Sequence, residues 1–293
     1  MNDQESSWGQ RLFVGLQQVL PQHLLSLLMY RVARIEWAPL KNLMIRAYVR
    51  LVGVDLRAAA QPEPTAYPHL NAFFTRALRP DARPLDPDPR AVLSPVDGTI
   101  SQIGSITDGR IIQAKGLDYA VRDLLGGRGE AHHLFDGGRF ATIYLSPRDY
   151  HRIHMPLAGE LAEMTYFGGR LFSVNQATAA QVPGLFARNE RVLCLFGTDL
   201  GPLAVVLVGA IFVGGIETVW EGEVAPALSG LRTRRWHYTG ATARVHLDRG
   251  EEMGRFNLGS TVILLFPAAT LTWDPALVPG QSVRFGQRIG TRD

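Results

Sequence analysis

Three short segments carry side chains able to act as acid, base or nucleophile. Asp97 stands in the turn SPVDGT, and His151 and His154 stand in YHRIHMP. Ser260 follows a glycine in LGST, at the entry to an apolar run. A serine hydroxyl needs a base to become a nucleophile, and the base needs a carboxylate to orient it. Asp97, one of the two histidines and Ser260 would supply such a set.

Each segment also has a simpler interpretation. Asp97-Gly98 is a favoured β-turn pair, and Ser260 is compatible with a plain strand entry. Two histidines without a carboxylate at metal-ligand spacing are a weak metal signal, and His132-His133 is the only other cluster, so we expect no metal. General acid–base work suits histidine better. The Gly-x-Ser-x-Gly elbow of many hydrolases is absent.

The elements that must position these residues are mostly strands. The chain has 293 residues, 46% of them apolar, which is enough for a full core. Its single cysteine, Cys194, excludes a disulfide framework within one chain. No strands alternate with long helices, so a doubly wound fold is not expected. We predict an α+β fold with a mixed or antiparallel β-sheet core and peripheral helices. The strands are expected at Gly98–Ile106, Arg110–Ala114, Phe140–Leu145, Gly159–Tyr166, Arg191–Gly197, Pro202–Val213, Glu217–Glu223, Ala243–Leu247 and Ser260–Phe266.

The chain divides into three parts. Residues 1–57 are expected to form amphipathic helices, residues 58–92 a proline-rich connector with one short helix at about Pro68–Arg79, and residues 93–293 the β-rich catalytic domain. In residues 40–52 a helical period places an apolar face opposite Lys41, Arg46 and Arg50.

The positive charge is concentrated near the N-terminus. Residues 8–57 carry seven basic side chains against two acidic ones, whereas the rest of the chain after them is balanced. No stretch is long enough to span a membrane, and no signal peptide is evident. Basic helices bearing aromatic residues favour a monotopic anchor on anionic lipid. The alternative is a helical subdomain packed on the core. The basic residues are too sparse for a nucleic-acid surface.

Together these segments resemble the phosphatidylserine decarboxylases of the bacterial and mitochondrial type. LGST resembles the self-cleavage motif of that family, YHRIHMP its histidine motif and PVDG its aspartate motif. Further similar segments appear in order from about residue 65 to 267, including FFTR, QAKG and LFSVN. The stretch 225–245 and the tail after Phe266 are the least family-like, and no function is assigned to them.

The resemblance implies a precursor that cuts itself between Gly259 and Ser260. His154 would be the base on the Ser260 hydroxyl, and Asp97 would orient His154. The products would be a β chain, residues 1–259, and an α chain, residues 260–293. Ser260 would become a covalent pyruvoyl group, which forms a Schiff base with the substrate amine and serves in place of pyridoxal phosphate. His151 would return a proton, and Tyr144 would help line the site.

The resemblance also implies the substrate and the setting. Phosphatidylserine in the bilayer would become phosphatidylethanolamine and CO2. Arg148 and Arg152 are candidates for binding the headgroup. The N-terminal helices would dock on the cytoplasmic side of a bacterial inner membrane, and two copies of the α–β heterodimer would pair. The competing functions are a serine hydrolase using Asp97, His154 and Ser260, and a non-catalytic membrane-binding protein.

Overall fold

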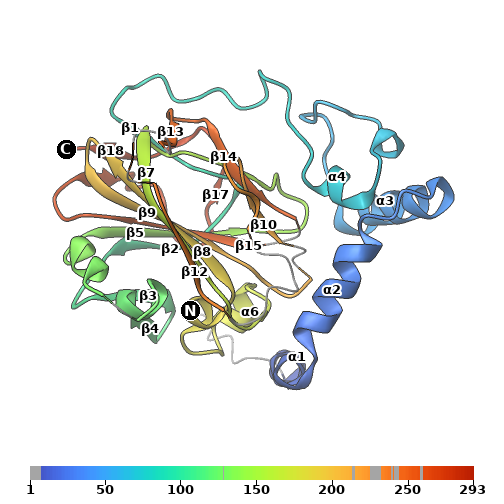
Figure 1. Ribbon diagram of the computed structural model, residues 1–293, viewed down its shortest axis with the longest axis horizontal. Helices are drawn as coiled ribbons and strands as arrows, with labels where there is room; N and C mark the ends of the chain where they lie inside the picture. Colours follow the sequence, from blue (N-terminus) through green and yellow to red (C-terminus); the bar gives the residue numbers. More distant parts are fainter. Residues whose placement is uncertain are drawn as a thin grey trace.

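A computed structural model describes residues 8–127, 129–212, 215–224, 232–238, 240, 244–257 and 260–293. The first residue of the predicted strand Ala243–Leu247 and the last of Pro202–Val213 lie outside this range, as do Leu258 and Gly259. Figure 1 shows a β body with three N-terminal helices along one side. These are α1 (Trp8–Val19), α2 (Gln22–Val32) and α3 (Ala38–Val52).

The body is built on one large antiparallel sheet. In spatial order its strands are β12 (Arg234–His237), β7 (Gly159–Phe167), β8 (Arg191–Thr198), β9 (Gly201–Val208), β15 (Ser260–Phe266), β5 (Arg139–Leu145), β2 (Gly98–Ser105) and β17 (Ser282–Val283), with β13 (His246–Leu247) beside β7. The register pairs are antiparallel throughout the described part of this sheet. The predicted α+β class with an antiparallel core is confirmed.

Smaller sheets and short helices complete the body. A second sheet runs β11 (Gly222–Glu223), β10 (Ile216–Thr218), β14 (Glu252–Phe256) and β6 (Arg152–His154), and a third runs β1 (Ala91–Leu93), β18 (Arg288–Arg292) and β16 (Leu271–Trp273). A hairpin joins β3 (Arg110–Ala114) to β4 (Leu117–Ala120). The short helices are η1 (Pro64–Ala66), α4 (Leu70–Phe74), α5 (Val121–Leu124), η2 (Ala131–Phe135), α6 (Gln176–Ala179) and α7 (Leu185–Arg188).

Strand β15 lies at the centre of the large sheet and is buried on both faces. Successive side chains on a strand point to opposite faces. Val262, Leu264 and Phe266 accordingly join one core cluster, while Ile263 and Leu265 join the other. The first cluster also contains Ile153 of β6 and Met253 and Phe256 of β14. By the same alternation Ser260 lies on the face covered by this second sheet.

The helix predicted at residues 40–52 is confirmed as α3, and its predicted apolar face is buried only in part. Leu43 is 65% exposed and Leu51 86%, whereas Ile45 is fully buried. Lys41 is also buried, because its ammonium donates to the carbonyl oxygens of Thr65 and Tyr67, both at 2.8 Å. These bonds explain how a cation replaces an apolar residue on the inner face.

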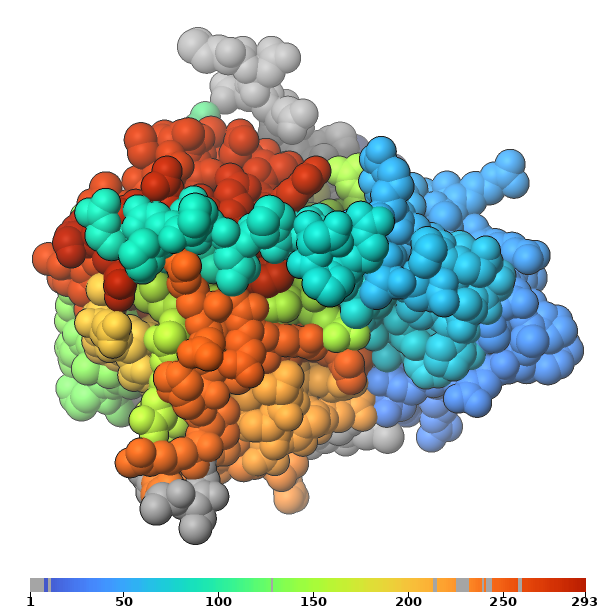
Figure 2. Space-filling model, turned by 90° about the horizontal axis from the view of Figure 1, so that it is seen from above, coloured from blue at the N-terminus to red at the C-terminus, as the bar shows by residue number. Residues whose placement is uncertain are grey.

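The connector crosses the surface of the body. In Figure 1 the chain leaves α4 and runs along the edge of the molecule to β1, and in Figure 2 the same cyan segment lies over the C-terminal residues. The helix predicted at Pro68–Arg79 is shorter, as α4 ends at Phe74. Within the described residues no single helix is long and apolar enough to span a membrane, although α1 from Leu12 and α2 together meet the length and composition test, with a bend of 88°.

Candidate active site

Ser260 is fully buried at the first position of β15, opposite Leu145 of β5. Its hydroxyl has no hydrogen-bond partner among the residues that the structure describes. Leaving a buried hydroxyl unpaired costs about 1–3 kcal/mol. Such a group is uncommon in a folded chain and calls for an explanation, and a reactive role is one. Gly259, the other half of the predicted cleavage site, lies outside the described residues.

His154 ends β6 and is held by three contacts. Its Nδ1–H donates to the carbonyl oxygen of Gly250 at 2.9 Å, and its Nε2 accepts from the Tyr150 hydroxyl at 3.0 Å. A carbonyl only accepts, so the tautomer follows from this pair of bonds. The Phe285 ring stacks on the imidazole, with centroids 3.6 Å apart. Burial lowers the pKa of His154 to about 4, so the ring is neutral near pH 7 and its Nε2 is a base.

His151 is fully buried and has an open nitrogen. Its Nδ1–H donates to the Asp149 carbonyl oxygen at 2.9 Å, while Nε2 has no partner among the described residues. The ring contacts Phe74 of α4, with centroids 4.0 Å apart. Burial lowers the pKa of His151 to about 3, and the nearby Arg76 cation acts in the same direction. The imidazole is therefore neutral near pH 7, and the lone pair of its Nε2 is unpartnered among the described residues.

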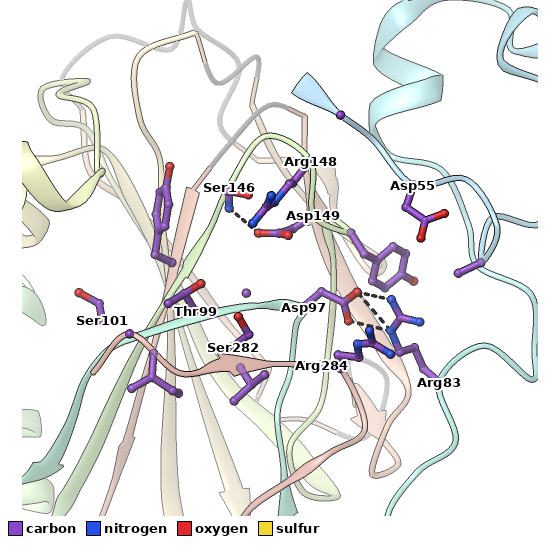
Figure 3. A pocket seen from close by; sticks show the side chains of 18 of the residues that line it. Asp55, Arg83, Asp97, Thr99, Ser101, Ser146, Arg148, Asp149, Ser282 and Arg284 are labelled. Carbon is purple, nitrogen blue, oxygen red and sulfur yellow. Dashed lines mark hydrogen bonds and ion pairs between the residues drawn. The ribbon is translucent and has the colours of Figure 1, made fainter. Parts of the chain in front are cut away.

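Asp97 is buried in the turn before β2, and its two oxygens are already engaged. The Arg83 Nε–H donates to Oδ1 at 3.0 Å, and Arg83 Nη2 reaches Oδ2 (Figure 3). The backbone N–H of Phe285 donates to Oδ1 at 2.9 Å. No hydrogen bond joins Asp97 to His154 in the described chain. The orienting bond that the sequence analysis assigns to Asp97 is instead made by the Gly250 carbonyl, and Phe285 contacts both side chains.

The three remaining predicted residues, Tyr144, Arg148 and Arg152, line cavities. Tyr144 and Asp97 border a cavity of about 600 Å³, together with the exposed Arg148. Tyr144 pairs with Thr261, so strand alternation directs it to the face opposite Ser260. Arg152 borders a second cavity of about 520 Å³, where its guanidinium is paired with Glu252 at 2.8 Å. The roles given to these residues stay predictions.

Several residues of the site were missed by sequence reasoning. Arg83 comes from the connector and Phe285 from the C-terminal tail, to which no function had been assigned. Tyr150 belongs to the quoted histidine motif but received no role. The arginine is one of several in a Pro-rich run, and Phe285 stands in no recognisable motif. The contact from Gly250 is made by its backbone carbonyl, which every residue has, so the residue type does not predict it.

The residues around position 260 fit a group made from the chain itself. Ser260 Oγ and His151 Nε2 are both buried without hydrogen-bond partners among the described residues, as is Thr261 Oγ1. A serine hydroxyl that is converted into a carbonyl does not need a lasting hydrogen-bond partner. Among the described residues, no three histidine, cysteine or acidic side chains lie together as metal ligands.

The fold and site define an α+β enzyme with a buried serine at the start of a central antiparallel strand and two neutral, buried histidines in one loop-to-strand segment. Comparison with known families makes this class specific. The model of the phosphatidylserine decarboxylase family matches residues 70–291, and a second model, described as PSD, matches residues 12–51. The chain belongs to the phosphatidylserine decarboxylase family.

Curated relatives agree over almost the whole chain. The chain is 56% identical over 283 residues to the phosphatidylserine decarboxylase proenzyme of Azotobacter vinelandii, covering 96% of this chain and 98% of the relative. It is 55% identical to the proenzyme of that name from Pseudomonas fluorescens, over 96% of this chain and 97% of the relative. The Bordetella pertussis proenzyme is 56% identical, over 95% of this chain and 94% of its own.

Proposed function

We propose that this enzyme converts phosphatidylserine to phosphatidylethanolamine and CO2, using a pyruvoyl group that it makes by cutting itself between Gly259 and Ser260. The observation that carries the proposal is the fully buried, unpartnered Ser260 hydroxyl at the start of β15. Family membership supports the reaction, and the word proenzyme in the names of the relatives supports the self-cleavage.

The first stage uses the serine as a nucleophile. The Ser260 hydroxyl attacks the Gly259 carbonyl and gives its proton to Nε2 of His154, so that the peptide bond becomes an ester. The Tyr150 hydroxyl, which now occupies Nε2, leaves it for this step. Elimination then expels the Gly259 carboxylate. Hydrolysis of the residue left at position 260 releases ammonia and leaves the pyruvoyl group at the start of the α chain.

The second stage depends on proton transfer at His151. The pyruvoyl group supplies a carbonyl that takes up the substrate amine and accepts the electron pair left by CO2. The amine arrives as an ammonium and must lose a proton before it can react. The Nε2 atom of His151 has no partner among the described residues and is open to exchange that proton. The same nitrogen then returns a proton to the α-carbon after CO2 has left.

The N-terminal helices are proposed to bring the site to an anionic membrane surface. Large apolar side chains on α1 to α3 are exposed: Trp8, Leu12, Phe13, Leu16, Val19, Leu24, Leu28, Leu43 and Leu51. Arg31, Arg46 and Arg50 belong to the same helices. Apolar and basic side chains on such helices suit a peripheral position on the cytoplasmic side of a bacterial membrane. The cut enzyme is proposed to pair as a homodimer of α–β units.

Mass spectrometry under denaturing conditions tests the proposal. We expect a fragment that ends at Gly259 and an α chain whose N-terminus is blocked to Edman degradation. Ser260→Ala and His154→Ala should remain uncut, whereas His151→Ala should be cut and decarboxylate poorly. An intact chain that is active on esters would instead favour a serine hydrolase. Full processing of His154→Ala would contradict its role as the base.

A further inference from the structure

Arg76 is a buried cation without an anionic partner. Its side chain follows α4, and the residue is 4% exposed. No ion pair to Arg76 is found in the described chain, and neither Nε nor Nη1 has a hydrogen-bond partner there. Nη2 alone is engaged, since it donates to the carbonyl oxygens of Arg148 at 3.1 Å and Asp149 at 3.4 Å. A buried charge in a folded protein is usually paired, which points to a partner that arrives with a ligand.

The other arginines around the two cavities already have partners or face solvent. Arg76 borders both cavities. Its buried or half-buried neighbours are each paired with a carboxylate: Arg83 with Asp97, Arg152 with Glu252, Arg255 with Glu217 and Arg34 with Glu223. Arg148 and Arg284 are exposed. Among the described arginines that line the two cavities, Arg76 alone is buried with guanidinium N–H groups that lack hydrogen-bond partners.

Three contacts place Arg76 beside the reacting centre. The Asp149 carbonyl that accepts from Arg76 also accepts from Nδ1 of His151. Phe74, two residues before Arg76, packs against the His151 ring. Asn71 of the same helix donates to the side chain of Asn257 at 3.2 Å, just before the cleavage site.

A guanidinium fork recognises a carboxylate or a phosphate, and the substrate carries both. The carboxylate is the group destroyed by the reaction. A strong ion pair to it would stabilise the reactant more than the transition state and would slow the chemical step. The phosphodiester keeps its charge throughout. It is joined to the α-carbon through a single carbon and an oxygen, so it reaches a residue next to the imidazole that protonates that carbon.

We propose that Arg76 holds the phosphodiester of the substrate headgroup, an inference that rests on the phosphatidylserine substrate proposed above. Arg76 thereby fixes the headgroup while His151 exchanges protons with the amine and the α-carbon. Arg148 and Arg152, the candidates from the sequence, are then secondary, because one is exposed and the other is already paired.

Binding of soluble probes to the uncut Ser260→Ala chain tests this without requiring activity. Calorimetry should show glycerophosphoethanolamine, which has the phosphodiester and no carboxylate, binding at least about tenfold more tightly than ethanolamine or inorganic phosphate. Equal binding of ethanolamine would overturn the proposal. Equal binding of inorganic phosphate would overturn it too, since the site would then serve a free anion.

Variants separate the phosphodiester from the carboxylate. Arg76→Gln in the uncut chain should weaken glycerophosphoethanolamine and glycerophosphoserine by the same factor, about 10- to 100-fold. Arg76→Lys should lie between, since it keeps the charge without the fork. The matched control Arg284→Gln, which removes an exposed cation from the same cavity, should change binding less than about twofold. Loss of glycerophosphoserine binding alone would assign the carboxylate to Arg76 and overturn the proposal.

Kinetics of the cut enzyme give a second measurement. Arg76→Lys should raise KM for phosphatidylserine in mixed micelles and leave kcat within about threefold, as expected for binding that is equal in the ground and transition states. A fall in kcat with unchanged KM would contradict the assignment. The proposed function itself fails if the unmodified chain neither cuts itself nor releases CO2 from phosphatidylserine. That outcome differs from every result described above for the Arg76 variants.

Discussion

At the scale of single residues, the two histidines of one motif lie in different environments. His154 has both ring nitrogens bonded, to Gly250 and Tyr150, and is clamped by Phe285. His151 keeps Nε2 free. The fixed ring of His154 suits self-cleavage, which would happen once per chain. The unpartnered Nε2 of His151 suits a proton transfer that would be repeated at every turnover. The geometry thus supports different roles for residues that look equivalent in the sequence.

Both histidines should make the folded chain sensitive to acid. Their pKa values are lowered to about 4 for His154 and about 3 for His151, against an ordinary 6.5. The unfolded chain therefore binds protons first as the pH falls below 6.5, and stability is lost as the pH falls further. We expect about 2 kcal/mol of unfolding free energy to be lost per histidine between pH 6.5 and about pH 4.5. Urea titration of the uncut Ser260→Ala chain measures it.

Replacement of one histidine provides the control for this pH dependence. His151→Gln in the same uncut chain removes one titrating group and keeps a polar side chain. The loss of stability with acid should be about 2 kcal/mol smaller in this variant. An identical pH dependence in the two chains would show that His151 is not neutral and buried in the way described.

At the scale of elements, the C-terminal tail completes the site. Phe285 follows β17, and its ring and its backbone N–H contact different partners, His154 and Asp97. In the proposed cut enzyme the tail would belong to the α chain, while His154 and Asp97 would belong to the β chain. The proposed two chains are therefore held together at the site itself, as well as by the ladders of β15 with β5 and β9.

Phe285→Ala tests the contribution of the tail. It removes the ring that stacks on His154 and keeps the N–H that binds Asp97. We expect self-cleavage to slow by about tenfold, since an aromatic contact of about 0.5–1.5 kcal/mol and the fixed orientation of the base are lost. The fraction of cut chain against time, read on denaturing gels, measures it. Phe285→Tyr, which keeps the ring, should cut at nearly the normal rate, and equal rates for the two variants would contradict the role of stacking.

At the scale of the whole molecule, the exposed apolar residues gather on the N-terminal helices, to one side of the β body (Figure 1). The inner side of these helices is fastened to the rest of the chain. Ile45 packs with Leu70 and Phe73, and the Tyr48 hydroxyl donates to the Pro147 carbonyl at 2.7 Å. The helices are therefore a fixed part of the surface near the histidine-bearing loop, with their outer side chains available for lipid.

Vesicle binding tests this surface. Replacing Leu12 and Leu16 of α1, which are 57% and 51% exposed, by Gln should weaken binding to phosphatidylglycerol-containing vesicles by about tenfold or more, because each buried apolar side chain contributes about 1.5–3 kcal/mol. Self-cleavage should be unchanged, since neither residue belongs to the site. The control Ile112→Gln alters an apolar side chain of β3 that is 51% exposed. Equal effects of the control and the double variant in flotation assays would refute a specific docking surface.

The sequence by itself predicted the candidate reactive residues and determined most of the elements that carry them. The continuous apolar run of β15 and the helical period of α3 are patterns of neighbouring residues, from which the strand and the helix follow directly. Asp97, His151, His154 and Ser260 are predicted as site residues because their motifs are short and contiguous. Lys41 shows the limit of such patterns, since its burial depends on two carbonyl groups of the connector.

Only the tertiary structure decided which groups hold those residues in place. Phe285 binds Asp97 across 188 positions of sequence, and Gly250 orients His154 across 96. In the sequence Arg76 resembles the other arginines, and only the structure shows that it is buried without an anionic partner among the described residues. Such hydrogen bonds join backbone groups and side chains that only packing brings together, so neighbouring residue types do not predict them. The cost of burying an unpaired charge likewise depends on the tertiary surroundings of that charge.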